Sequence, residues 1–414
     1  MTWPLRSVSE LCEFAVDCVN KTAPVVEGAT PYKMIRTTNV KGGFIDIKDV
    51  RHVSKDTFEK WTRRSRPRYG DVILTREAPV GEVGRCTFDA DENIFLGQRL
   101  FHYRPNPELL DWNYLAYVLQ SPEVQGRLHG RSFGATVPHV KVGDAETLLI
   151  PCPPMDIQRR IGSILANYDD LIATNQRRIA LLEDATRRLY REWFVHLRFP
   201  GYESVPVKDG VPEGWRKQTL ASVADVNARS IGARDRPDSV LYIDISTVST
   251  GHIGEVTPYA FADAPGRARR RVVHGDVIWS CVRPNRRSYA LIWEPDERLV
   301  ASTGFAVLSA TGVPFSYLYF TTTTDAFVGH LEQNATGAAY PAVTAKIFED
   351  AETLVPIGDT LPAFDRAVLP TLEQIETLKQ QNRALARARD LLLPKLMSGQ
   401  LDVSGIHLPE EVAA

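Results

Sequence analysis

Two long stretches of the chain repeat apolar residues at helical spacing. From Asp156 the apolar positions recur every three or four residues over about five heptads, which is typical of a coiled-coil seam. They are Ile157, Ile161, Ile164, Tyr168 and Leu171 and, after a one-residue shift, Ile172, Ile179, Leu182, Leu189 and Trp193. Asp156 can cap the helix, and Pro200-Gly201 ends it. The pattern predicts a helix of about 38 residues, which at ~1.5 Å per residue is nearly 57 Å long.

A second stripe of equal length lies near the end of the sequence. It opens after the residues GDTLP and is weakened at Pro394. Its positions are Leu361, Phe364, Val368, Leu372, Ile375, Leu378, Leu385, Leu392 and Leu396. Two stripes of matching length most simply bind each other, and the alternative is that each packs on its own globular domain. The length of each rod, greater than that of either globular part, favours mutual pairing.

Both stripes are interrupted by polar amides. The first contains Asn175 beside Gln176, and the second contains Gln381 beside Asn382. A buried amide in such a seam costs stability but can fix register and orientation. We therefore expect Asn175 and Asn382 to set the register of the helix pair. The alternative is a solvated face with a local stutter.

The remaining sequence predicts mixed domains of strands and short helices. Short β-rich runs such as Asp71–Thr75 and Asp276–Ser280 alternate with Gly and Pro. One helix is expected in each half, at Trp112–Leu119 and near Phe315–Thr321. An α+β fold fits this pattern better than a doubly wound sheet.

Four landmarks recur in the same order at a displacement of about half the chain. They are IRTTNVKGGFI (35–45) with IDISTVSTGHI (243–253), YGDVIL (69–74) with HGDVIW (274–279), GATVPHV (134–140) with GAAYPAV (337–343), and DAETLLIP (144–151) with DAETLVP (350–356). The displacements are 208, 205, 203 and about 206 residues. The sequence is therefore a tandem duplication.

The repeat and the stripes together predict the domain organisation. The expected segments are a first mixed domain at 1–153, a central helix at 154–200, a second mixed domain at 201–358, a C-terminal helix at 359–403 and a tail at 404–414. We expect two tandem mixed α/β domains separated by two long helices that form an antiparallel coiled coil with pseudo-twofold symmetry.

Composition narrows the class of protein. With 414 residues, 43% of them hydrophobic, the chain is too long for one ordinary core and too apolar for a disordered tail. The five cysteines, scattered without CxxC or Cys/His spacing, indicate neither a zinc site nor a disulfide framework. Without a signal pattern or an apolar run of about 18 residues, we expect no membrane association and a cytoplasmic protein.

The charge is unevenly distributed. A net charge of -2 would ordinarily argue against a nucleic-acid partner, but 37 of the 49 basic residues are Arg and many are clustered. Each GDV strand is preceded by four arginines: Arg63, Arg64, Arg66 and Arg68 in the first copy, and Arg267, Arg269, Arg270 and Arg271 in the second. The usual interpretation of one such run is a solvated loop. Its recurrence in the duplicate favours phosphate contact.

Further basic residues distinguish the two copies. Arg283, Arg286 and Arg287 follow the second GDV strand, whereas the first copy has only Arg76 and Arg85 in that stretch. This asymmetry suggests different targets. The loops GATVPHV and GAAYPAV either let the backbone approach a ligand or are simple turns. Arg131 precedes the first loop and is a further candidate for DNA contact.

Motifs for catalysis and metal binding are absent from the sequence. There is no phosphate loop, no GxGxxG after a strand, no HExxH, and no Asp/Asn-Pro-Pro-aromatic motif of amino-methyltransferases. The PD dipeptides at Pro237-Asp238 and Pro295-Asp296 lack the acidic-x-Lys partner of a nuclease site. Asp169 and Asp170, on the first predicted rod, are expected to be exposed. We therefore expect no catalytic residues and no metal site.

Three segments resemble the specificity subunit of type I restriction-modification systems. Ile157–Glu203 looks like its central spacer, Val211–Leu220 (VPEGWRKQTL) like the entry to its second target-recognition domain, and Arg389–Val403 (RDLLLPKLMSGQLDV) like its closing signature. The likeness covers essentially the whole chain. It is specific in the helical regions and generic within the recognition domains.

The resemblance implies a non-catalytic subunit that binds double-stranded DNA. It would recognise a split, asymmetric sequence with one domain per half and hold two methyltransferase subunits, with restriction subunits able to join. S-adenosylmethionine, ATP and Mg²⁺ are expected on those partners, and no cofactor on this chain. Two rival functions are an enzyme with a degenerate nuclease or methyltransferase site, and a coiled-coil adaptor that joins proteins without DNA readout.

Overall fold

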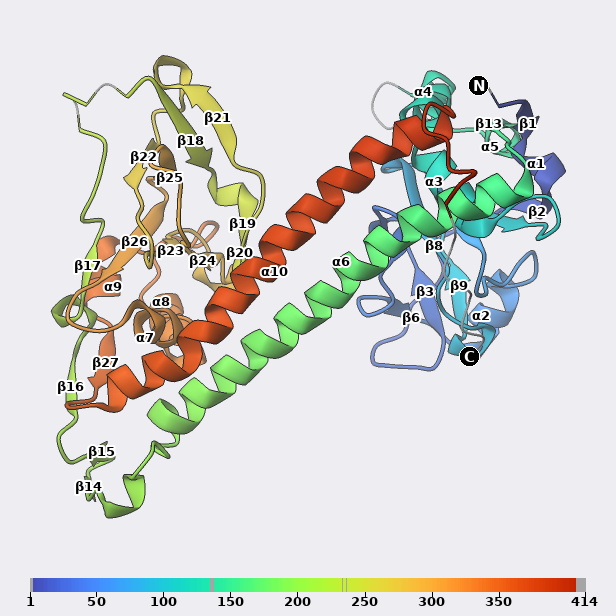
Figure 1. Ribbon diagram of the computed structural model, residues 1–414. Coiled ribbons are helices and arrows are strands. Elements are labelled where there is room, and N and C mark those ends of the chain that lie inside the picture. Colours follow the sequence, from blue (N-terminus) through green and yellow to red (C-terminus); the bar gives the residue numbers. More distant parts are fainter. Residues whose placement is uncertain (1–2, 135–137, 233, 236, 407–414) are drawn as a thin grey trace. The chain divides into compact units, whose positions relative to one another are not determined.

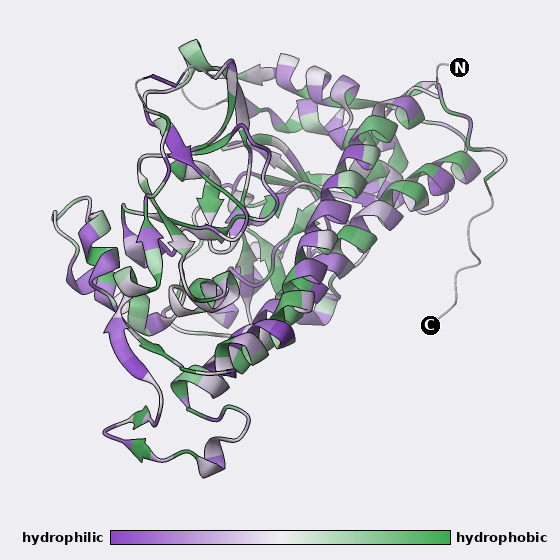
Figure 2. Ribbon diagram, turned by 60° about the vertical axis from the view of Figure 1, so that its left-hand side comes forward, coloured by the Kyte–Doolittle hydropathy of each residue, from purple (hydrophilic) through white to green (hydrophobic). Residues whose placement is uncertain are grey.

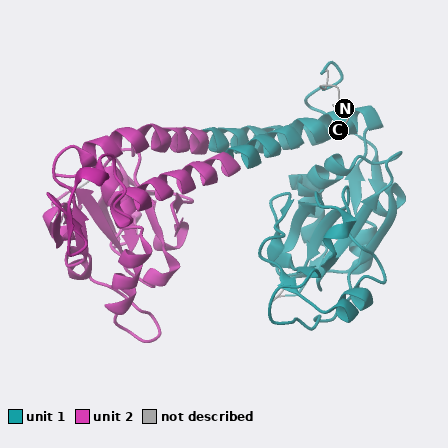
Figure 3. Ribbon diagram, turned by 90° about the horizontal axis from the view of Figure 1, so that it is seen from below, with its two compact units in different colours: residues 1–175, 381–414 teal, residues 176–380 magenta. Residues whose placement is uncertain are grey.

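The computed structural model describes residues 3–134, 138–232, 234–235 and 237–406. The chain divides into two compact units, Met1–Asn175 with Gln381–Ala414, and Gln176–Gln380 (Figure 3). Both long helices, α6 (Met155–Tyr190) and α10 (Thr360–Met397), contribute a segment to each unit. Each unit is therefore a mixed domain together with parts of two helices.

Unit 1 is built on a four-stranded antiparallel sheet in the order β2-β10-β7-β8 (Figure 1). A second sheet has the order β6-β3-β9, in which β3 and β9 are parallel. The strands are β1 (Leu5–Ser7), β2 (Cys12–Asp17), β3 (Lys33–Ile35), β4 (Val40–Lys41), β5 (Phe44–Ile45), β6 (Arg51–His52), β7 (Val72–Arg76), β8 (Val80–Arg85), β9 (Ile94–Leu96), β10 (Leu100–Pro105), β11 (Ser132–Phe133), β12 (His139–Val140) and β13 (Leu149–Pro151). The helices before α6 are α1 (Val8–Leu11), α2 (Lys55–Trp61), α3 (Trp112–Gln120), α4 (Pro122–Gly130) and α5 (Val142–Glu146), with 3₁₀ turns η1 (Thr37–Asn39) and η2 (Ala90–Glu92).

Unit 2 repeats this plan. Its antiparallel sheet has the order β17-β26-β23-β24, and its second sheet, β21-β18-β25-β22, again contains one parallel pair, β18 with β25. The strands are β14 (Val207–Lys208), β15 (Val211–Pro212), β16 (Arg216–Thr219), β17 (Ala224–Val226), β18 (Ser239–Ile243), β19 (Val248–Ser249), β20 (His252–Ile253), β21 (Thr257–Ala260), β22 (Ala268–Arg271), β23 (Val277–Ser280), β24 (Tyr289–Leu291), β25 (Leu299–Ser302), β26 (Phe305–Ala310) and β27 (Glu352–Val355). The helices are α7 (Phe315–Thr321), α8 (Asp325–Gln333) and α9 (Ala345–Glu349), with a π turn η3 (Arg191–Val195) and 3₁₀ turns η4 (Tyr202–Ser204), η5 (Leu220–Ser222), η6 (Ile245–Thr247), η7 (Phe261–Asp263) and η8 (Pro284–Arg286).

Three of the four sequence landmarks occupy equivalent elements in the two units. The first begins in β3 or β18, continues through a 3₁₀ turn and ends in a short hairpin, β4-β5 or β19-β20. The GDV landmark forms β7 or β23, and the DAET landmark runs from the end of a short helix into β13 or β27. The loop landmark at 134–140 includes 135–137, which lie outside the described residues, as do residues 407–414 of the expected tail. The duplication in the sequence is thus a duplication of the fold.

The first half of α6 packs closely on the mixed part of unit 1. Ile161 and Leu165 join the core that contains β7, β10 and α3. A Cβ at Gly162 would lie 2.6 Å from Asp111 Oδ1 and 2.9 Å from the Tyr114 backbone N, so only glycine lets α6 approach the capped start of α3. The end of α10 contributes Leu396 and Met397 to the same core. The two helix segments therefore share one core with the sheet.

Aromatic side chains hold the corresponding helix segments in unit 2. Phe364 of α10 lies against Phe194, with ring centroids 4.9 Å apart, and against Tyr190, 5.9 Å away. All three are buried in the core that also contains Trp279 and Tyr317. Burying each such side chain contributes roughly 1.5–3 kcal/mol to the free energy of folding. Figure 2 shows apolar and polar residues alternating along both helices, as an amphipathic helix requires.

Within each unit the two helix segments run antiparallel. In unit 1, Asp169 pairs with Arg389 and Asn175 with Asn382, so residue numbers rise along one helix as they fall along the other. In unit 2, Glu183 Oε1 and Lys379 Nζ are 4.0 Å apart, and the Phe364 ring lies against the Phe194 ring. Since the same segments also pack on the mixed domains, mutual pairing and packing on the domain occur together.

Candidate nucleic-acid interface

The first arginine segment of unit 1 is a loop between α2 and β7. Arg63 and Arg64 are exposed, and Arg64 forms an ion pair with Asp17. Arg66 is more enclosed: its Nη2 donates to Asn93 Oδ1 at 2.8 Å, and its guanidinium lies 5.2 Å from the Phe58 ring centroid.

Arg68 is the last arginine of this loop, and its guanidinium lies 3.7 Å from Glu13. Arg63, in contrast, makes no hydrogen bond or salt bridge to any residue that the structure describes. Its guanidinium is therefore the one in this loop without an ionic or hydrogen-bonding partner among the described residues.

A buried carboxylate fixes the end of the same loop. Asp71 Oδ2 accepts hydrogen bonds from the Arg68 backbone N at 2.8 Å, from Arg104 Nη2 at 2.8 Å and from His102 Nε2 at 2.7 Å. Burial works to raise the pKa of Asp71, but the hydrogen bonds from Arg104 and His102 outweigh it, so the pKa lies below its ordinary value. Asp71 therefore stays ionised and anchors the loop.

The second arginine segment takes a different structure. Arg267 precedes β22, and Arg269, Arg270 and Arg271 lie on it, paired with β25. Arg269 packs over the Phe261 ring at 5.0 Å, and Arg271 faces Asp235 at 3.6 Å. The segment is a strand here and a loop in unit 1.

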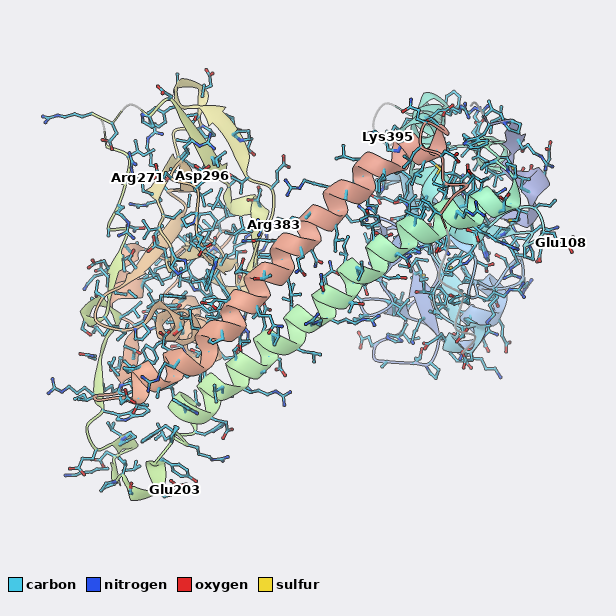
Figure 4. All side chains as sticks on the ribbon, viewed as in Figure 1. Glu108, Glu203, Arg271, Asp296, Arg383 and Lys395 are labelled. Carbon is cyan, nitrogen blue, oxygen red and sulfur yellow. The ribbon has the colours of Figure 1, made fainter. Side chains whose placement is uncertain are left out.

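Two arginines of this segment have side-chain nitrogen atoms without a partner among the described residues. Arg267 is exposed and forms no hydrogen bond or salt bridge through its side chain within the described part of the chain. The Nε of Arg270 is buried and has no partner there. Figure 4 shows Arg271 in the part of unit 2 that carries Asp296, whose carboxylate is bound by Arg298 at 2.7 Å.

The aspartate of the second GDV strand acts as Asp71 does. Asp276 Oδ2 accepts from the Val273 backbone N at 2.8 Å, and both carboxylate oxygens accept from Arg229 Nη2, at 2.8 and 2.9 Å. These two aspartates were not among the functional residues predicted from the sequence. The signal was present, since a carboxylate at the start of a buried strand recurs in both copies.

Arg283, Arg286 and Arg287 surround the turn η8 in unit 2. Arg283 and Arg287 have φ of 51° and 53°, a left-handed conformation that costs a non-glycine residue roughly 1–2 kcal/mol. Arg287 forms an ion pair with Asp325 at 2.5 Å, and Arg286 is exposed without a side-chain partner among the described residues. Backbone strain of this kind is concentrated at functional sites.

The remaining candidate, Arg131, follows α4 in unit 1. Its backbone N caps the helix by donating to Leu128 O at 3.2 Å, and its side chain is partly exposed. The loop that it leads into contains residues 135–137, which lie outside the described residues.

The two seam amides are in contact. Asn175 Nδ2 donates to Asn382 Oδ1 at 3.0 Å, and Asn382 Nδ2 donates to Ile172 O at 3.4 Å. Asn175 is buried, whereas Gln176 and Gln381 are exposed.

Two expectations for the first helix were wrong. Leu171, placed in the seam, is 54% exposed. Asp169, expected at the surface, is buried and accepts hydrogen bonds from Arg389 Nη1 at 2.5 Å, Arg85 Nη2 at 3.4 Å and Tyr117 Oη at 2.5 Å. Its neighbour Asp170 is exposed as expected.

Among the described residues, no cluster of three or more His, Cys, Asp or Glu side chains could hold a metal ion. In the same part of the chain, no helix has the length and apolar character needed to span a bilayer.

Known proteins of one kind are similar to this chain. A family model described as the type I restriction modification DNA specificity domain matches residues 2–184. Residues 2–184 are thus similar to this DNA specificity domain, and the curated relatives are named as type I restriction enzyme specificity subunits. The resemblance stated from the sequence is thereby confirmed.

Specificity subunits of other organisms match most of the length of this chain. The type I restriction enzyme MjaIX specificity subunit of Methanocaldococcus jannaschii is 22% identical over 85% of this chain and 82% of its own. The type I restriction enzyme HindI specificity subunit of Haemophilus influenzae is 18% identical over 86% of this chain and 90% of its own. The crystal structure of a type I S subunit from M. genitalium has a TM-score of 0.56 at 15% identity and covers 96% of both chains, which shows a shared fold.

Proposed function

We propose that this chain is the sequence-specific DNA-binding subunit of a type I restriction-modification complex. The mixed domain of each unit binds one half of a bipartite, asymmetric target in double-stranded DNA. The observation that carries the proposal is the duplicated fold with unlike basic surfaces: an arginine loop in unit 1, and an arginine strand plus the η8 arginines in unit 2. The equivalent folds let the two domains bind DNA in similar ways, and their different side chains recognise two different half-sites.

The two helices separate the half-sites. We infer that α6 and α10 form one antiparallel coiled coil through both units, with pseudo-twofold symmetry at the Asn175–Asn382 contact. Helices of 36 and 38 residues are about 54 and 57 Å long. This exceeds one turn of DNA, ~34–36 Å, so two domains on such rods can face the same side of a duplex.

The chain itself is not an enzyme, and the chemistry belongs to its partners. Two methyltransferase subunits bind along the helices, and restriction subunits join them. S-adenosylmethionine, ATP and Mg²⁺ are bound by those partners in the cytoplasm. Large apolar side chains exposed on the helices support protein docking there: Leu171 and Leu181 on α6, and Leu391 on α10.

Mobility shifts of DNA with this chain, alone and with its methyltransferase, test the proposal. We expect a sequence-specific shift by the complex and no methyl transfer or cleavage by the chain alone. An assembly that forms without binding DNA would support the adaptor instead. Turnover by the chain alone, with Mg²⁺ and S-adenosylmethionine, would support the enzyme.

The free arginines predict the salt dependence of binding. Arg63→Ala and Arg267→Ala should each weaken binding to all sequences similarly and reduce the slope of log K against log salt by about 1. Arg64→Ala is the matched control, because Asp17 already neutralises Arg64. Titrations at several salt concentrations measure the slope, and unchanged slopes for Arg63→Ala and Arg267→Ala would contradict phosphate contact.

A further inference from the structure

A short hairpin projects between α8 and α9 of unit 2. Thr336 and Ala342 close it with two backbone hydrogen bonds, each 2.9 Å. Gly337, with φ of 99°, begins the tip, and its missing Cβ leaves room for Tyr340 O, which a Cβ would approach to 3.0 Å. The tip is therefore a closed turn with a defined conformation.

The η8 loop holds this hairpin from the side. The Arg283 backbone N donates to Pro341 O at 2.7 Å, and the Val343 backbone N donates to Cys281 O at 2.9 Å. Val282 and Ala342 form an isolated β-bridge. The left-handed conformation of Arg283 directs its N–H to the tip, so two loops far apart in sequence form one rigid element.

An aromatic ring and a guanidinium meet on this element. Tyr340 is 68% exposed, and the Arg283 Cζ lies 4.6 Å from its ring centroid. The one hydrogen bond of the Arg283 guanidinium within the described residues is long, from Nη2 to Ala339 O at 3.4 Å. Since a guanidinium carries five N–H donors, most of them remain available to a ligand.

The neighbouring arginines are arranged differently. Arg287 is neutralised by Asp325, and Arg286 is exposed without a side-chain partner among the described residues. An exposed cation without a fixed partner suits contact with phosphate, because phosphate contacts require positive charge and carry no sequence information. Arg283, held against a ring on a rigid turn, is the pre-organised one, as base recognition requires.

We propose that Arg283 and Tyr340 form a base-reading element of unit 2, an inference that rests on the proposed function. Arg283 donates two hydrogen bonds to O6 and N7 of a guanine in the major groove, the commonest specific contact of arginine with DNA. The Tyr340 ring holds the guanidinium and excludes water from one of its faces. Arg286 contacts the phosphate backbone beside it.

Mapping methylated adenines tests this assignment, with the full chain and its methyltransferase expressed in cells. Arg283→Ala should abolish the preference for guanine at one position of one half-site and lower discrimination there by about ten- to a hundredfold, leaving the other half-site unchanged. Arg283→Lys should restore binding but only part of the preference, because lysine lacks the planar fork. Tyr340→Ala should weaken the preference at the same position.

Arg286→Ala is the matched control. It should lower affinity for all sequences and leave the motif intact. Thermal unfolding of each variant should match that of the unchanged chain, because both side chains project from the surface of the element.

Several outcomes would overturn the assignment. One is a motif unaltered by Arg283→Ala, and another is a unit 2 half-site without a G·C pair. Loss of methyltransferase assembly at an unchanged motif would make this element a protein-docking surface instead. If the chain without any substitution gave no methylation motif, the proposed function itself would be contradicted. This result is distinct from the outcomes above, which contradict only the roles of Arg283 and Tyr340.

Discussion

At the scale of single residues, buried ionic groups organise unit 1. Asp71 anchors the arginine loop to β7, and Asp169 joins α6 to Arg389 of α10 and to Arg85 of β8. Each carboxylate is almost fully buried and accepts hydrogen bonds from three residues. Removing one partner of such a group leaves a buried charge uncompensated, so these sites are sensitive to single substitutions.

Asp169→Asn should destabilise the protein by about 3–5 kcal/mol, because Arg85 then has no carboxylate in a buried site. Denaturant unfolding measures this change. Asp170→Asn, at the exposed neighbouring position, should change stability by less than about 0.5 kcal/mol. Equal effects of the two substitutions would contradict the role of Asp169.

His102 should make stability depend on pH. Burial lowers the pKa of His102 even though Asp71 acts in the opposite direction, so the folded protein keeps this ring neutral. Below a pH of about 6.5 the unfolded chain binds a proton that the folded chain does not, and stability decreases as the pH falls.

His102→Gln should flatten this pH dependence. An amide can still donate to Asp71 and accept from Ser65 but does not titrate. Unfolding free energies measured between about pH 7.5 and 5 give the two slopes. The same slope in both proteins would contradict a neutral, buried His102.

At the scale of elements, apolar patterning predicts α10 well and α6 less well. Leu361, Phe364, Val368, Leu372 and Ile375 were placed in the seam from their spacing, and all are buried. The buried stripe of α6 also includes four polar residues, which are Gln158, Asp169, Asn175 and Thr186. A search for apolar periodicity does not select Gln158 and Asp169, because they are polar. It assigns the exposed Leu171 to the seam instead.

The arginine clusters show the same limit at the candidate site. Sequence spacing identifies Arg64 and Arg68, but their partners, Asp17 and Glu13, lie about 50 residues away in the chain. Which arginines remain free depends on such distant contacts. Local sequence likewise does not distinguish the loop at Arg63 from the strand at Arg269.

The Asn175–Asn382 contact predicts a coupling energy. Asn175→Leu and Asn382→Leu should each destabilise the helix pair by about 1 kcal/mol, because each leaves an amide facing an apolar side chain. The double substitution should be nearly neutral or stabilising, with weaker specification of register. Denaturant unfolding in a double-mutant cycle measures the coupling, and additive losses would contradict it.

At the scale of the whole molecule, the duplication fits the proposed recognition of an unsymmetrical DNA site by one chain. The two units share an element order, as β3-η1-β4-β5 and β18-η6-β19-β20 illustrate. Their basic side chains differ in position and in partners. A common frame with divergent surfaces lets each half-site change independently while the helices stay the same.

The most direct measurement is a map of methylated adenines in cells that contain this chain and its methyltransferase. It should be made with the unchanged chain and with a variant that adds four residues, about one turn, to both helices beside the Asn175–Asn382 pair. Adding them to both helices keeps the pairing on each side. We expect two unlike half-sites at a fixed gap, and in the variant the same half-sites at a different gap. A continuous symmetrical motif, or half-site sequences that change with helix length, would contradict the division into two recognition units held apart by the helices.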